Sequence, residues 1–214
     1  GIELEDESPG ILPNPDWLRA NHPAERWSDG FTANTSIGQG FVLTSPLQMA
    51  SVSATVANGG KAWSPHLLKR VMDHDKAVLE NPPSLRGDLS ASVKPEEIEV
   101  IRRGMWKVVN DPSGTGKGAR ITGVEVAGKT GAAQKFDSGN KRFSSERVRT
   151  SFMGFFPSEN PRFVMLVSID EPQLHKWGGQ AAAPVFKSIS QQLIRCFEPD
   201  IGETPPVQEQ DINT

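Results

Sequence analysis

The sequence lacks the ingredients of several kinds of protein. Its 214 residues include a single cysteine, Cys196, which excludes an internal disulfide and a cysteine-based zinc site. The four histidines show no metal-ligand spacing, so we expect no metal and no cofactor. A net charge of −3 provides no basic surface for nucleic acid, which is therefore not an expected partner. Because no run of about 18 apolar residues exists, we expect no membrane-spanning segment in this chain.

One helix is signalled by its own first turn. Ser45 suits the N-cap, Pro46 suits the first helical position, and Gln48 completes a capping box, so we expect a helix that ends near Ala57. The preceding residues, 1–35, are rich in Pro, Gly, Asn and Asp. We expect them to form an irregular segment held in place by tryptophans.

The second half of the chain changes from helix to strands. Glu96 and Glu97 suit the first turn of a helix from Pro95 to about Asn110. Helices followed by an antiparallel strand set and a covering helix predict an α+β fold, with an antiparallel sheet flanked by helices. Apolar patterns predict strands over 124–134, 150–156 and 162–169 and a closing helix over 182–197, in which Cys196 is expected to be at least half-buried.

The domain organisation follows from this order. Residues 1–197 are expected to form one part of a domain, with an irregular segment and helices over 1–120. Strands, a hairpin and the final helix are expected over 121–197. Residues 198–214 carry five acids and no basic residue, so we expect an acidic disordered tail there.

The stretch from Val126 to Gln134 suggests chemistry. On a strand, Lys129 and Gly131 lie on one face and Thr130 on the other. Gly131 leaves the strand edge open, and a positive charge beside it would suit an extended peptide that ends in a carboxylate and pairs by β-augmentation. Taken alone, however, these residues favour an ordinary solvent-exposed strand.

The wider sequence changes that interpretation. Lys129-Thr130-Gly131 resembles the K-T-G element of penicillin-recognising serine enzymes. The surrounding sequence resembles the class B penicillin-binding proteins, the monofunctional transpeptidases of cell elongation and division. The resemblance covers nearly all of residues 1–197 in the family's order, and it rests on segments 1–10, 37–50, 151–157, 167–172 and 182–186.

The resemblance implies the C-terminal portion of the penicillin-binding/serine β-lactamase-like fold, in a D,D-transpeptidase that cross-links peptidoglycan stem peptides and binds β-lactams. Lys129 would bind the substrate or β-lactam carboxylate and tune the local field for proton transfer. Thr130 and Gly131 would shape the strand beside the acyl group, and the Ala132 backbone N–H would be one of two oxyanion-hole donors. The family usually has Thr or Ser in place of Ala132, which puts side-chain recognition of the carboxylate in doubt.

The resemblance also implies a setting. The expected location is the periplasmic face of a bacterial inner membrane, with an anchor outside this chain. Peptidoglycan stem peptides and β-lactam antibiotics would be ligands. A membrane glycosyltransferase and morphogenesis proteins would be partners of the parent protein.

Two elements of the family are missing. In the family, an S-x-x-K supplies the acylated serine and its lysine, and both this element and an S-x-N precede the region that the start of this chain resembles. Neither element occurs before the K-T-G in this chain. Ser138-Gly139-Asn140-Lys141 matches both patterns but follows the K-T-G, and we interpret it as part of an exposed loop over 136–149. We therefore expect a fragment of a longer transpeptidase, inactive by itself.

Other interpretations were weighed against this one. Residues 113–118 invite a phosphate-loop reading, but Asp111 replaces the first glycine and Gly118 replaces the magnesium-binding hydroxyl, so a plain loop is expected. A non-catalytic scaffold that binds wall peptides is an alternative that Ala132 fits weakly. A serine β-lactamase or β-lactam sensor is another, and the landmarks in 37–50 count against it.

Overall fold

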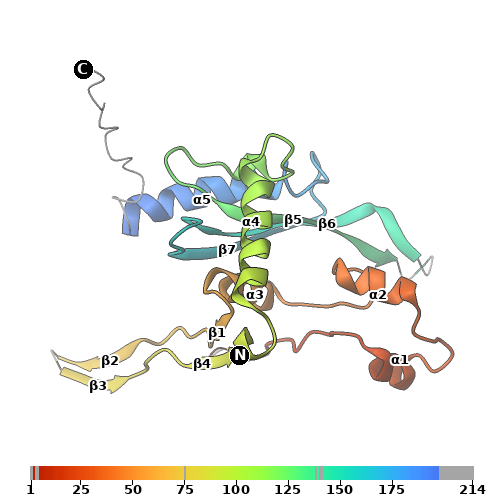
Figure 1. The fold of residues 1–214 in the computed structure, drawn as a ribbon, viewed down its shortest axis with the longest axis horizontal. Coiled ribbons are helices and arrows are strands. Elements are labelled where there is room, and N and C mark those ends of the chain that lie inside the picture. Colours follow the sequence, from red (N-terminus) through yellow and green to blue (C-terminus); the bar gives the residue numbers. More distant parts are fainter. Residues whose placement is uncertain (1, 3–4, 75, 138, 140–141, 198–214) are drawn as a thin grey trace. The chain divides into compact units, whose positions relative to one another are not determined.

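The computed structural model describes residue 2 and residues 5–74, 76–137, 139 and 142–197. It divides into two compact units, residues 1–94 and residues 95–214, which we describe separately (Figure 1). The tail predicted over 198–214 lies outside the described residues, so its disorder stays a prediction.

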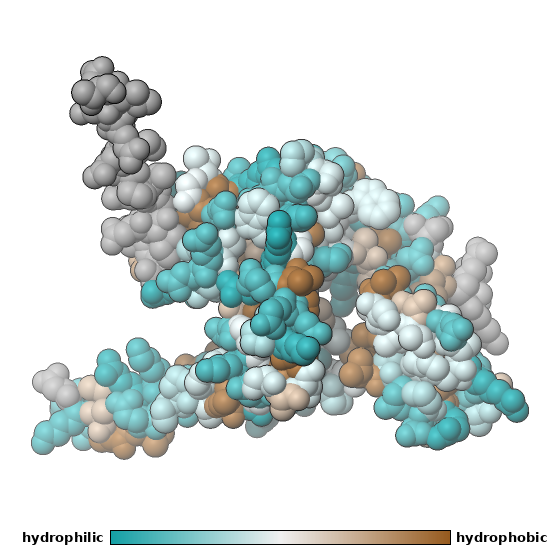
Figure 2. All heavy atoms as spheres, viewed as in Figure 1, coloured by the Kyte–Doolittle hydropathy of each residue, from teal (hydrophilic) through white to brown (hydrophobic). Residues whose placement is uncertain are grey.

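The first unit combines helices with small antiparallel sheets. Strand β1 pairs with β4, and β2 pairs with β3. Figure 2 shows hydrophobic side chains on the surface of the β2–β3 hairpin, where Val71, Met72, Val78 and Leu79 are exposed. The elements are α1 (Pro15–Asn21), α2 (Asp29–Ser36), α3 (Pro46–Ala57), β1 (Lys61–Trp63), β2 (Arg70–Asp73), β3 (Lys76–Glu80), β4 (Leu85–Asp88) and the 3-10 helix η1 (Leu89–Ala91).

Helix α3 confirms the capping prediction. The Ser45 hydroxyl accepts a hydrogen bond from the Gln48 backbone N–H at 3.1 Å, and the Gln48 side chain accepts one from the Ser45 backbone N–H at 2.9 Å. The Gln48 amide also donates to the carbonyls of Ser8 and Pro9. The capping box thereby ties the start of α3 to the N-terminal segment.

The prediction of an irregular segment over 1–35 is wrong in part, because α1 and all but the last residue of α2 lie within it, whereas its anchoring by tryptophans is confirmed by the contacts of Trp17 with Phe41 and of Trp27 with Phe31. The Asn14 side chain caps α1 by accepting from the Trp17 backbone N–H at 2.8 Å. Ring contacts then hold these short helices in place, with Phe41 stacked on His22 at 4.5 Å and on Phe31 at 6.0 Å between ring centroids. Tertiary aromatic packing therefore stabilises helices that would be too short to persist alone.

The second unit is a three-stranded antiparallel sheet flanked by helices, which confirms the α+β fold. The strand order is β5-β6-β7. Helix α5 packs on one face, where Phe186 contacts Phe152 at 4.8 Å and Phe156 at 5.7 Å (Figure 1). The elements are α4 (Pro95–Asn110), the 3-10 helix η2 (Lys117–Ala119), β5 (Ala127–Asp137), β6 (Arg142–Phe156), β7 (Phe163–Asp170) and α5 (Ala182–Phe197).

Two expectations for this unit are wrong. The loop expected over 136–149 is mostly strand, because the β5–β6 ladder continues past the covered sheet to a Phe136–Phe143 cross-strand pair. Cys196 is exposed, since it lies in the last residues of α5, where Arg195 and Phe197 are exposed as well. Of the Ser138–Lys141 match, only Gly139 is among the described residues, and it lies in a turn.

Candidate active site

The four residues singled out from the sequence lie consecutively on one strand. Lys129, Thr130, Gly131 and Ala132 belong to β5, which pairs with β6 on one side and is the edge of the sheet within the described residues. Gly131 lies opposite Ser151 in this ladder. An edge strand keeps a row of main-chain donors and acceptors on its open side, where an extended ligand can pair.

Hydrogen bonds identify which main-chain groups of β5, and of Val126 just before it, point to the open side. The Val126 carbonyl accepts from the Asn110 side chain at 2.8 Å, and the Thr130 carbonyl accepts from the Lys129 ammonium at 2.7 Å. In an antiparallel strand, the N–H and C=O of one residue share a side and alternate along the chain. The N–H of Ala132, two residues after Thr130, therefore points away from β6 toward the open edge.

The Lys129 side chain is exposed, and its ammonium curls back to the open edge. The ammonium donates to the Thr130 carbonyl, which lies on the edge where a peptide would pair with β5. The ammonium thus lies beside the Thr130 carbonyl, and the Ala132 N–H follows two residues later, about 7 Å along the strand. This combination can bind an extended ligand that carries a carboxylate and a carbonyl.

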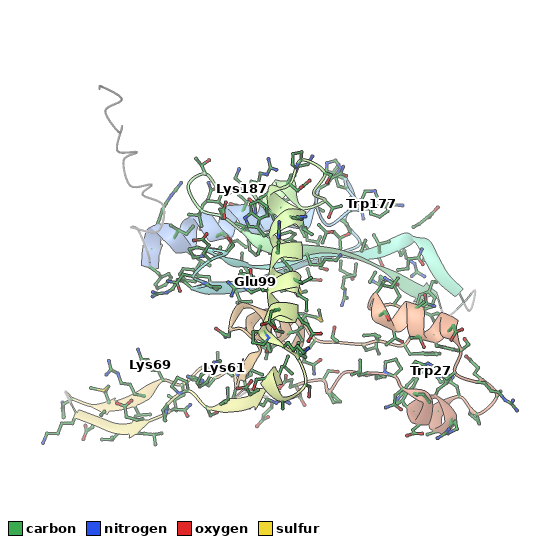
Figure 3. All side chains as sticks on the ribbon, viewed as in Figure 1. Trp27, Lys61, Lys69, Glu99, Trp177 and Lys187 are labelled. Carbon is green, nitrogen blue, oxygen red and sulfur yellow. The ribbon has the colours of Figure 1, made fainter. Side chains whose placement is uncertain are left out.

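Two glycine-rich segments pack against β5 at Thr130 and Gly131. The Thr130 hydroxyl lies 3.1 Å from the Thr115 hydroxyl, in the loop between α4 and η2. Gly178 and Gly179 follow Trp177 (Figure 3) in the β7–α5 connection, residues 171–181, and pack so tightly that an added Cβ would clash with Gly131 and Thr115. These close contacts fix the position of the strand from behind.

Helix α4 closes the start of the open edge. The Asn110 side chain donates to the Trp106 carbonyl at 2.9 Å as well as to Val126. Arg120 donates to the carbonyls of Val109, Asn110 and Asp111 at the end of the same helix. The carbonyls at the end of α4 are thereby satisfied, and the edge is available only after Val126.

An ion-pair cluster anchors the other end of the site. The Lys135 ammonium donates to Asp170 at 3.0 Å and to Glu171 at 2.7 Å, and Arg149 donates to Asp170 at 3.2 Å. These bonds lower the pKa of Asp170, chiefly through Lys135 and then Arg149. The pKa of Lys135 is raised, chiefly through Glu171 and then Asp170. The cluster joins β5 to the end of β7.

Several of these supporting residues were missed from the sequence. Thr115 lies in the part of segment 113–118 that is a loop, as predicted, whereas Lys117 and Gly118 belong to η2. The glycines of this segment are required by close packing, since a Cβ at Gly116 would lie 2.9 Å from Phe152 and Val108. The spacing of glycines before the K-T-G was thus a usable signal for a loop pressed against the strand. Asn110 and Lys135 gave no local signal.

Two features are absent from the part of the chain that the structure describes. In residues 5–74, 76–137 and 142–197, no helix combines the length and apolar character needed to cross a bilayer. Across the same part of the chain, no group of three or more His, Cys, Asp or Glu side chains is placed to hold a metal ion.

Comparisons with known proteins agree with this arrangement. The family model described as penicillin binding protein transpeptidase domain matches residues 1–191. Peptidoglycan D,D-transpeptidase MrdA of Acinetobacter baumannii is 34% identical over 193 residues, covering 87% of this chain and 28% of that protein. Stage V sporulation protein D of Bacillus subtilis is 33% identical, covering 96% of this chain and 29% of that protein. The chain thus spans less than a third of these relatives.

Solved structures show the same fold. Penicillin-binding protein 3 of Mycobacterium tuberculosis in complex with ampicillin has a TM-score of 0.77 and 28% identity, covering 97% of this chain and 44% of that chain. Penicillin-binding protein PBP2 of Helicobacter pylori in complex with MreC has a TM-score of 0.67 and 26% identity, covering 91% of this chain and 33% of that chain.

Proposed function

The chain belongs to the penicillin-binding protein transpeptidase domain family, and on this basis we propose that it forms the substrate-binding wall of a serine-type peptidoglycan D,D-transpeptidase. The observation that carries the proposal is the open edge of β5, with the Lys129 ammonium and the Ala132 N–H on it. A stem peptide would pair with this edge as an added strand.

The proposed roles follow from charge and position. Lys129 binds the terminal carboxylate of the peptide or the carboxylate of a β-lactam. The Ala132 N–H donates to the oxygen of the scissile carbonyl as negative charge develops on it. Thr130 and Gly131 shape the strand beside the acyl group, between these two points. Gly131 has no side chain to obstruct a ligand backbone.

The nucleophile in this proposal comes from outside the 214 residues. A serine attacks the scissile carbonyl, its proton passes to a neighbouring lysine, and the terminal D-amino acid leaves with a proton. The acyl-serine then transfers its acyl group to the amine of a second stem peptide. No S-x-x-K precedes Lys129 in this chain, so the chain alone is expected to be inactive.

The setting of the parent protein is part of the same proposal. We infer that it acts at the periplasmic face of a bacterial inner membrane, where its substrate lies. A structural relative was solved in complex with MreC, which supports a morphogenesis protein as a partner. A membrane glycosyltransferase is the second proposed partner, because cross-linking must act on newly made glycan strands.

Acylation by penicillin in the full-length protein tests these roles. Ala132→Pro removes one N–H on the open side of an edge strand, where proline is tolerated. We expect its acylation rate constant to fall about 100-fold or more, and Lys129→Ala to lower it about tenfold. Val100→Ala, on the exposed surface of α4, is the control. Unchanged acylation in Ala132→Pro with an intact circular dichroism spectrum would contradict the oxyanion role.

A further inference from the structure

We propose that Phe136 and Phe143 form a second substrate subsite, which holds an aliphatic side chain of an extended stem peptide on the amino side of the scissile bond. This subsite rests on the function proposed above. It would make the enzyme distinguish long peptides from short ligands.

The two rings form a defined aromatic pair on the surface. They lie opposite each other in the β5–β6 ladder. Their centroids are 5.5 Å apart and their planes meet at 75°, an edge-to-face contact. Phe136 is nonetheless 55% exposed and Phe143 47% exposed. The pair therefore keeps enough free apolar surface to contact a ligand.

The direction of the bound peptide leads toward this pair. With the terminal carboxylate at Lys129 and the scissile carbonyl at Ala132, the peptide runs antiparallel to β5. Its remaining residues, on the amino side, must then continue past Gln134 toward Phe136. Four residues of strand separate Ala132 from Phe136, a distance of about 14 Å.

This distance separates two classes of ligand. An extended peptide gains about 3.3–3.6 Å per residue, so the residue beside Phe136 lies about four positions before the scissile carbonyl. A dipeptide or a compact β-lactam held at Ala132 cannot span that distance. The subsite would therefore act on long stem peptides and leave short ligands unaffected.

The position of the aromatic pair is fixed by the fold around it. The ladder is interrupted between Gln134 and Phe136, and bulges of this kind re-aim side chains. Lys135, at the interruption, is held by Asp170 and Glu171. On β6, the Ser144 hydroxyl accepts from the backbone N–H groups of Glu146 and Arg147. Lys135 thus anchors β5 just before Phe136, and the Ser144 bonds order β6 just after Phe143, which reduces the entropy lost when a ligand binds.

Steady-state kinetics of the full-length protein test the subsite. The variants are Phe136→Ala and Phe143→Ala, with Phe136→Leu as the conservative replacement and Phe197→Ala, an exposed phenylalanine on α5, as the matched control. The substrates are peptides of two and of six residues that end in two D-alanines. We expect either alanine variant to lower kcat/KM for the six-residue peptide about fivefold, and Phe136→Leu to restore most of it.

The controls separate the outcomes. The same variants should change kcat/KM for the two-residue peptide and the acylation rate with benzylpenicillin by less than about twofold. Equal losses for both peptides would overturn the subsite, because they indicate a general disturbance of β5. Unchanged kinetics for the six-residue peptide would overturn it as well. If penicillin acylates the native protein but the variants keep their kcat/KM for the six-residue peptide, only the subsite fails. If penicillin does not acylate the native protein, the proposed function fails and the subsite fails with it.

Discussion

The Asn110 side-chain amide donates to the main-chain carbonyl of Val126 across 2.8 Å, and so joins the end of helix α4 to the start of the candidate substrate-binding strand. The same amide donates to the Trp106 carbonyl within α4. One side chain therefore marks where the open edge of β5 begins and holds the helix beside it.

Replacing Asn110 with alanine should loosen this junction. Each lost hydrogen bond is worth about 0.5–1.5 kcal/mol, so we expect Asn110→Ala to lower the free energy of unfolding by about 1–2 kcal/mol. Urea denaturation measures the change, with Val100→Ala on the same helix as the control. A loss no larger than that of the control would show that the junction contributes nothing to stability.

The family resemblance implies a hydroxyl-bearing residue at the position of Ala132. If its side chain lies beside the substrate carboxylate, Ala132→Thr should add a charge-assisted hydrogen bond and raise the rate of penicillin acylation about tenfold. Ala132→Val has nearly the same shape without the hydroxyl and is the matched control. Equal effects of Thr and Val would mean that the carboxylate is bound without help from this position.

The Asp170 ion pairs predict a dependence of stability on acid. Because Lys135 and Arg149 lower the pKa of Asp170 in the folded chain, their contribution is complete above the ordinary value of 3.8 and is lost as pH falls through the lowered value. The difference in free energy of unfolding between the native protein and Asp170→Asn should therefore shrink below about pH 4. Chemical denaturation at pH 7 and at lower pH measures it.

Because the pKa of Lys135 is raised in the folded chain, its contribution to stability is lost at high pH instead of at low pH. Its contribution is complete below the ordinary value of 10.5 and is lost only as pH rises through the folded value. Glu159→Gln, which removes an exposed carboxylate outside the cluster, is the control for the acid series. A difference that stays constant from pH 7 to pH 3 would exclude the ion pairs as the cause.

Two glycines of β5 should respond differently to an added methyl group. A Cβ at Gly128 would clash with the Phe152 ring and lie 2.8 Å from the Met153 carbonyl, whereas one at Gly131 meets only the movable Ser151 hydroxyl at 2.5 Å. We expect Gly128→Ala to cost about 1–3 kcal/mol in stability and Gly131→Ala to cost less. Thermal unfolding compares them, and the reverse order would show that the packing around β5 is misassigned.

The sequence predicted those elements whose signals are local. Ser45, Pro46 and Gln48 specify the start of α3 within four residues, and the structure has the complete capping box. Pro95 with two glutamates marked α4 equally well. The family resemblance identified Lys129 as the key side chain, and the fold then placed it on an edge strand.

What could not be predicted depends on contacts between distant residues. Helices α1 and α2 are held by rings that meet around Phe41. The polar sequence after Gln134 gave no sign that Phe136 would pair with Phe143 and extend the hairpin. Likewise, the contact between Thr115 and Thr130 joins a loop to strand β5 across 15 residues of sequence, and it forms only on folding. The roles of the K-T-G residues remain predictions until they are measured.

The most direct test is intact-mass spectrometry after incubation with benzylpenicillin, on the full-length protein and on this chain with circular dichroism as a folding control. We predict one penicilloyl adduct on the full-length protein, mapped by peptide digestion to a serine before residue 1, and none on the folded chain. An adduct on the folded chain, above all at Ser138, would contradict the proposal that these residues form the binding wall of the site and another segment supplies its nucleophile.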